Sequence, residues 1–247
     1  MEKNEIHAVV NKNDAVYSFF ARNRKPFFIS GIAIVVLLAG FIAALIVRDA
    51  AQKDATAKLD ILVERYNELK GSLTENTADS SELEDSAGTE TVENLANAEA
   101  VESLLTDLQA LGKSAAGYPA ARAWFMAADI YHERNEWQTA QDAWLAAASK
   151  GGSTHITPVC LFNAAVAGEA AGNPDSALSN YKKALTFTDF PAAARAQFSV
   201  GRLAETGGDT EAAVTAYRAL IDKWPAETDW VNLAQSRLLF LDISSPE

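Results

Sequence analysis

The amino-acid sequence predicts an all-α fold, with one N-terminal membrane-spanning helix followed by an array of helical hairpins. Two observations lead to this prediction. Residues 27–47 form an uncharged, apolar run that is long enough to cross a bilayer. From Pro119 to Leu241, small and aromatic residues recur every 36 to 37 residues, with proline and glycine between the copies. We expect four parts: an N-terminal tail (1–26), a membrane helix (27–47), a degenerate first hairpin (48–112), and three repeats with a capping helix (113–242).

The predicted membrane helix has Ser30 as its only hydroxyl-bearing residue. As a helix, this run would be about 30 Å long, which matches the hydrocarbon core of a bilayer. A cleavable signal peptide is the alternative, but its apolar region would be shorter and would end in a small-x-small cleavage site. This run ends instead in Val47-Arg48-Asp49. We therefore expect the helix to be retained as an anchor.

The orientation of the anchor follows from the basic residues next to it. Arg22, Arg24 and Lys25 lie directly before the apolar run, with no acidic residue among them. Cytoplasmic flanks of membrane helices carry an excess of Lys and Arg. We therefore expect residues 1–26 in the cytoplasm and the rest of the chain, after the helix, on the other side of the membrane.

Residues 49–70 are predicted to form a second helix, with one apolar seam that includes Leu59, Leu62 and Tyr66. Helical periodicity returns over 92–112, and we expect the two segments to pair as a degenerate first hairpin. Between them, residues 71–90 contain six acidic residues, no basic residue and few large apolar ones. This composition predicts a solvated, disordered insert, because it cannot cover a core.

The array itself is recognised by positions that repeat in register. Ala140, Ala177 and Ala213 occupy one position, and an aromatic residue follows each of them four residues later: Trp144, Tyr181 and Tyr217. Small residues let two antiparallel helices approach closely, and the aromatic residue fills the space between neighbouring hairpins. This is the tetratricopeptide pattern.

Helix-start signals support the same register. Prolines stand where each first helix should begin, and candidate N-caps stand before each second helix. The prolines are Pro119, Pro158 and Pro191; the candidate caps are Asn135, Asn173 and Asp209. A last helix that contains Trp230 and Leu241 has no partner and is expected to close the array.

Charge and motifs argue against several functional classes. The formal net charge of the chain is −12, and an acidic helical domain without a basic stripe argues against nucleic-acid binding. His132-Glu133 lacks the second histidine that a zinc-protease helix needs, and no glycine-rich phosphate loop is present. We expect no catalysis, no cofactor, no metal and no small-molecule substrate. The array is expected to be a binding surface for proteins.

The predicted binding surface lies on the first helix of each hairpin. One register position holds Phe125, Phe162 and Phe198, which would line an apolar peptide-binding groove if they face outwards. The alternative is that the three rings pack as ordinary core, because phenylalanine is usually buried. The polar candidates that flank this ladder are Arg122, Arg195, Arg202, His132, Glu169 and Glu205.

The order of these parts resembles the ancillary Sec-translocon subunit family of bacterial inner membranes. The resemblance covers roughly residues 15–241 and includes Phe19-Phe20, the Arg22-Asn23-Arg24 lead into the anchor, and the stretch 108–128. It implies a non-enzymatic periplasmic domain that works beside the Sec translocon with membrane-anchored chaperones and handles exported client proteins. The acidic insert at 71–90 departs from the compact pattern of that family.

Two functions remain open from the sequence. The first is a translocon-associated holdase or adaptor for exported proteins, which needs exposed apolar surface and loose specificity. The second is a structural scaffold that docks one folded partner in an envelope complex, such as a secretion, division or motility machine. A scaffold needs a matched surface that is largely charged or specific in shape.

Overall fold

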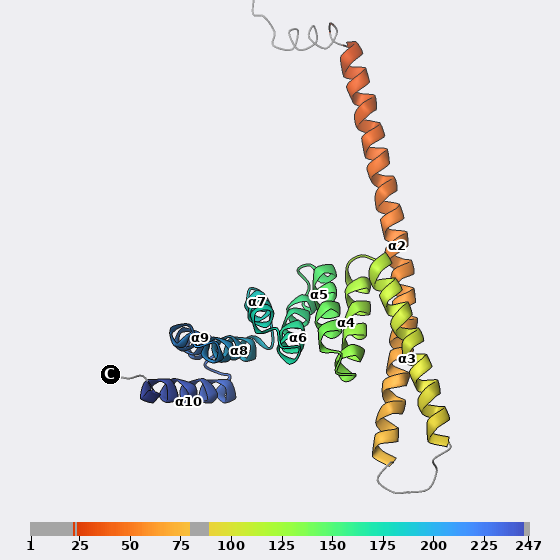
Figure 1. Cartoon of the computed structure of the whole chain (residues 1–247). Helices are drawn as coiled ribbons and strands as arrows, with labels where there is room; N and C mark the ends of the chain where they lie inside the picture. Colours follow the sequence, from red (N-terminus) through yellow and green to blue (C-terminus); the bar gives the residue numbers. More distant parts are fainter. Residues whose placement is uncertain (1–21, 23, 80–88, 245–247) are drawn as a thin grey trace, which may run out of the picture. The chain divides into compact units, whose positions relative to one another are not determined.

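The computed structural model describes residues 22, 24–79 and 89–244 of the chain, and the described part is helical throughout its regular elements. The predicted fold class is confirmed: a long apolar N-terminal helix is followed by helical hairpins (Figure 1). The chain divides into two compact units, Met1–Ala51 and Gln52–Glu247. Most of the predicted N-terminal tail, residues 1–21, lies outside the described residues.

The first unit contains the N-terminal part of helix α2 (Arg24–Asp79). Within the described residues, one helix is long and apolar enough to cross a membrane, with a mean hydropathy of 2.8 in its most apolar stretch. Its large apolar side chains are exposed, Phe28 and Leu37 by 73% each. Such a surface is unfavourable in water, whereas contact with lipid chains removes it from water.

The second unit begins with a hairpin between the rest of α2 and helix α3 (Thr89–Ser114). Leu59, Leu62, Leu104 and Leu108 are buried in one cluster, together with Met126 of the next helix. Arg65 Nη1 of α2 also donates to Asp107 Oδ2 of α3 at 2.6 Å. The apolar seams recognised in the sequence therefore pack against each other and against the array.

Both helices of this hairpin extend further than the sequence predicts. We expected a disordered insert over 71–90, but α2 continues through Asp79 and α3 begins at Thr89. Residues such as Ser, Thr and Asn cost only several tenths of a kcal/mol each in a helix, and a helix that is already nucleated tolerates that cost. The rest of the expected insert, residues 80–88, lies outside the described residues.

Three hairpins and a final helix follow (Figure 1). Residue bounds are as follows: the first hairpin is α4 (Tyr118–Glu133) and α5 (Trp137–Gly151), the second is α6 (Ile156–Ala170) and α7 (Pro174–Ala184), the third is α8 (Ala193–Thr206) and α9 (Thr210–Lys223), and the last helix is α10 (Thr228–Ser244). Ala234 and Leu241 of α10 are buried against Tyr217 and Leu220 of α9. Helix α10 thus covers the apolar end of the last hairpin.

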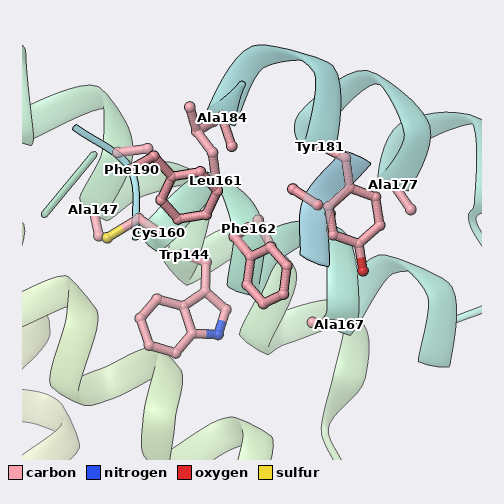
Figure 2. Close-up of a cluster of buried hydrophobic side chains, with 14 of the residues drawn as sticks. Trp144, Ala147, Cys160, Leu161, Phe162, Ala167, Ala177, Tyr181, Ala184 and Phe190 are labelled. Atoms are coloured by element: carbon pink, nitrogen blue, oxygen red, sulfur yellow. The ribbon is translucent and has the colours of Figure 1, made fainter. Parts of the chain in front are cut away.

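The register positions form the core of the array. Ala140, Ala177 and Ala213 are fully buried. The aromatic residues that follow them, Trp144, Tyr181 and Tyr217, are at most 2% exposed. Figure 2 shows part of the resulting cluster, in which side chains from α5, α6 and α7 surround one another.

One helical glycine shows how tightly the hairpins pack. Gly201 of α8 lies against the ring of Tyr217, and a β-carbon added there would lie 2.6 Å from Cε1. Real β-carbons essentially never approach another atom so closely. Glycine is therefore required here by the space between α8 and α9, since the backbone is an ordinary part of the α8 helix.

The helix ends agree with the sequence only in part. Pro119 stands in the first turn of α4, and Asp209 caps α9 by accepting from the Ala212 backbone N–H at 2.9 Å. Asn173 precedes α7, but its Nδ2 donates to Gln138 Oε1 at 2.7 Å instead of its side chain capping the helix. Asn135 was expected to cap α5, which is wrong: Glu136 holds the cap position, and Asn135 adopts a positive φ of 60° in the turn.

Candidate protein-interaction surface

The phenylalanine ladder packs inside each hairpin. Every ladder residue contacts the aromatic residue of the second helix in the same hairpin: ring centroids are 4.5 Å apart for Phe125 and Trp144, 5.4 Å for Phe162 and Tyr181, and 5.5 Å for Phe198 and Tyr217. Phe162 is only 6% exposed, whereas Phe125 and Phe198 are half-buried. The expectation that Phe162 lines a groove is therefore wrong, because its ring lies in the core shown in Figure 2.

Two arginines cover the ladder from outside. The Arg122 guanidinium lies 4.9 Å from the Phe125 ring centroid, and that of Arg195 lies 5.1 Å from the Phe162 ring centroid. Guanidinium groups at this distance are attracted to the negative face of an aromatic ring. Arg195 belongs to α8 and Phe162 to α6, so this contact also joins neighbouring hairpins. Arg195 remains exposed to solvent.

Glu169, in the second hairpin, forms a polar tie to the third. Its carboxylate accepts from Tyr181 Oη at 2.8 Å and from Arg202 Nη2 at 2.5 Å. Burial raises the pKa of Tyr181, and the hydrogen bond to Glu169 raises it further. The Tyr181 hydroxyl therefore stays protonated and donates, as this arrangement requires.

Glu205 repeats the arrangement one hairpin later. It accepts from Tyr217 Oη at 2.9 Å and from Arg237 of α10, whose Nε donates at 3.1 Å and whose Nη2 makes a second contact. The hydrogen bond from Arg237 lowers the pKa of Glu205, although partial burial opposes it. Burial raises the pKa of Tyr217 to about 12, with further contributions from Glu205.

The sequence identified three members of these ties, Arg202, Glu169 and Glu205, but missed the others. A recurring spacing could have revealed them: each glutamate is followed by a tyrosine 12 residues later and by an arginine 32 or 33 residues later. The side chains thus join one hairpin to the next, and their charged groups are largely paired within the array.

The first hairpin lacks this tie. His132 occupies the position of Glu169 and stacks edge-on against Trp137, with ring centroids 5.0 Å apart. Trp144 and Val166 stand where the other copies have tyrosine and arginine. A pocket of about 180 Å³ lies at this junction, and its lining residues are Asp129, His132, Trp144, Asn163 and Val166.

A charged cluster that the sequence did not predict lies beside this pocket. Lys70 of α2 contacts Asp129 and Glu133 of α4, each at 2.8 Å, and Tyr66 also donates to Asp129. Partial burial alone would lower the pKa of Lys70, but its hydrogen bonds to the two carboxylates raise it on balance. Burial raises the pKa of Tyr66 to about 12, and Asp129 contributes to the rise. Over the residues that the structure describes, no cluster of three potential metal ligands occurs.

The fold and these ties define a class of protein: a tetratricopeptide repeat array, which is a protein-binding module and typically a non-enzymatic scaffold. Comparison with known proteins agrees with this class. Residues 162–228 match the tetratricopeptide repeat family. The chain thus combines one long apolar N-terminal helix with helical hairpins of the tetratricopeptide type.

Individual proteins also show similarity to this chain. A TPR repeat-containing protein of Treponema pallidum (strain Nichols) is 33% identical over 143 residues, which are 57% of this chain and 59% of that protein. The chain thus matches less than two thirds of the relative's length. The crystal structure of MamA is 18% identical and covers 57% of this chain and 76% of its own, with a TM-score of 0.44.

Proposed function

We propose that this chain is a membrane-anchored protein-binding adaptor of the bacterial inner membrane that serves exported proteins beside the Sec translocon. In this proposal α2 crosses the membrane through residues 27–47, with the N-terminus in the cytoplasm and the repeat array in the periplasm. The observation that supports the proposal best is a repeat array that follows in the chain on a long apolar helix whose large side chains are exposed. The translocon setting comes from the resemblance in the order of its parts.

The burial of the ladder bears on what the array binds. A holdase needs a broad apolar surface, but Phe162 is buried, and Phe125 is half-buried with the Arg122 guanidinium over its ring. The exposed candidates are polar, namely Arg195 and Arg202. This favours a partner with a matched, partly charged segment over loose binding of unfolded chains.

A second candidate follows from the same observation. A scaffold that docks one folded partner in a secretion, division or motility complex would also present a charged, specific surface. The two proposals differ in the number and kind of partners. An adaptor for export contacts the translocon, a membrane-anchored chaperone or several clients, whereas a scaffold contacts one partner.

Site-specific crosslinking tests the proposal. A photoreactive residue at Arg195 of the full-length chain, in native membranes, is expected to capture translocon subunits or exported proteins that mass spectrometry identifies. The matched control is the same residue at Asp222, which is exposed on α9. A single folded envelope protein captured at Arg195 favours the scaffold. Capture of cytoplasmic proteins alone contradicts both candidates.

A further inference from the structure

The junction between the first and second hairpins differs chemically from the next two junctions. In those, a half-buried glutamate lies between a tyrosine hydroxyl and an arginine of the next hairpin or of α10. In the first junction the corresponding residues are His132, Trp144 and Val166. No internal carboxylate therefore fills the position that Glu169 and Glu205 occupy.

This substitution leaves a buried hydrogen-bond donor without an acceptor. Trp144 is 2% exposed, and its Nε1 has no hydrogen-bond partner among the described residues. Trp144 is also one of the five residues that line the pocket of about 180 Å³. By register it corresponds to Tyr181, whose hydroxyl donates to Glu169. A buried donor costs free energy until an acceptor reaches it.

We propose that this pocket binds a primary carboxamide side chain, glutamine or asparagine, from an extended segment of a protein partner. The inference rests on the proposed protein-binding function and names one recognition element of it. The pocket is smaller than the roughly 300–1,000 Å³ that small-molecule sites occupy, so it suits the end of one side chain. The rest of the segment would lie along the array.

The lining groups match a carboxamide. Its carbonyl oxygen would accept from Trp144 Nε1, which is buried in the free chain and would be uncovered as the segment enters, and its NH₂ group would donate to the carboxylate of Asp129. Tyr66 and Lys70 donate to one oxygen of Asp129, and a carboxylate has about four acceptor positions, so capacity remains. Asn163 can donate to or accept from a carboxamide as well.

The local charge disfavours an acidic side chain. Lys70 is the cation paired with Asp129, and it is shared with Glu133, so two carboxylates face one lysine. A further carboxylate would add negative charge to this partly buried place. An apolar side chain would fill the volume but would leave the indole N–H unpaired. A neutral group that both donates and accepts satisfies the donor without added charge.

Three peptides test the proposal on the full-length chain in lipid nanodiscs. The probe is acetyl-Ala-Ala-Gln-Ala-Ala-N-methylamide, whose only primary carboxamide is the glutamine side chain, and its analogues carry glutamate or leucine at the central position. The Trp144 indole N–H resonance, assigned with Trp144→Phe, reports binding, and Trp224→Phe is the matched control. We expect the glutamine peptide to shift this resonance and to bind about tenfold more tightly than either analogue, as one or two satisfied hydrogen bonds predict. Equal affinities, tighter binding of the glutamate peptide, or no binding of the glutamine peptide would overturn the proposal.

A variant that rebuilds the missing tie provides a second test. His132→Glu, Trp144→Tyr and Val166→Arg together install the residue types of the other two junctions. We expect this triple variant to unfold cooperatively at a melting temperature no lower than that of the wild type, and to lose the preference for glutamine. Retention of the preference in the folded variant contradicts the proposal. The peptide comparison on the wild-type chain still decides the matter if the variant does not fold.

The two proposals fail in different ways. The photoreactive residue at position 195 can be compared in the otherwise wild-type chain and in the triple variant. If it captures the protein partner equally well in both, the protein-binding function stands and the carboxamide pocket does not. If the glutamine preference holds while Arg195 captures only cytoplasmic proteins, the pocket stands and the proposed periplasmic function falls.

Discussion

Replacing Gly201 with alanine is expected to destabilise the array, although alanine is the better helix former. The added methyl group would lie 2.6 Å from Cε1, 2.8 Å from Cδ1 and 3.0 Å from Cζ of Tyr217. That ring cannot move aside easily, because it is fully buried, contacts Phe198 and donates to Glu205. Three ring atoms therefore resist the new side chain.

The magnitude is a balance of two terms. In a helix interior, alanine is more stabilising than glycine by about 1 kcal/mol. Overpacking a core lowers the stability of the folded protein by about 1–3 kcal/mol and occasionally more. With contacts under 3.0 Å to a buried ring, we expect the clash to dominate and the net loss to be about 1–2 kcal/mol. For a chain of this size, that lowers the melting temperature by roughly 2–8 °C.

Thermal unfolding of the full chain in detergent micelles, followed by tryptophan fluorescence, measures the effect. Gly71→Ala is the matched control, because Gly71 is helical and a β-carbon there meets no atom within 4 Å. The control is expected to be as stable as the wild type or slightly more stable. If Gly201→Ala behaves like Gly71→Ala, the tight packing of α8 on Tyr217 is refuted.

Three further predictions concern the core, the pH response and the topology. Phe162→Ala removes a buried ring in contact with Tyr181 and Phe190 and is expected to cost about 3–5 kcal/mol in unfolding free energy; a cost below about 1 kcal/mol would show that the ring is accessible after all. The pKa of Glu205 is lowered in the folded state, so its contribution to stability is present above the unfolded-state pKa and is lost as pH falls through the folded-state value. Glu205→Gln should therefore show a smaller loss of melting temperature than the wild type between pH about 5 and about 3, and equal losses would contradict this. Protease added to intact spheroplasts is expected to digest residues 49–247, whereas protection of this segment until lysis would reverse the proposed orientation.

The sequence was sufficient to predict the fold, because the hairpin register is set by a few strongly constrained positions. Ala140, Ala177 and Ala213 must be small where helices touch, and Tyr181 and Tyr217 must be large where hairpins meet. These requirements act locally along the chain, so they repeat at a fixed period. Helix ends were less predictable, since Asn173 can either cap a helix or bond a neighbouring hairpin, and only the tertiary structure decides between them.

The candidate site was only partly predictable, for a different reason. Phe162 has the same register position whether its ring lies in a groove or in the core, and the difference arises from how Arg195 and Phe190 cover it. The partners of Glu205 lie 12 and 32 residues away, on two different helices. The pocket beside Trp144 lies at a junction that lacks the glutamate–tyrosine–arginine tie. This difference can be recognised only once the structure has shown the ties at the later junctions.

The ties between hairpins have a consequence for how the array responds to ionic strength. Ion pairs join α8 to α6 and α10 to α8. Among the described residues, no ion pair joins the first hairpin to the second. There, neutral groups make the connection: Gln141 Nε2 donates to Ser176 Oγ at 2.7 Å. Salt screens exposed ion pairs but leaves neutral hydrogen bonds nearly unchanged. Rising ionic strength therefore weakens the α6–α8 and α8–α10 junctions, whereas the junction beside Trp144 keeps its stiffness.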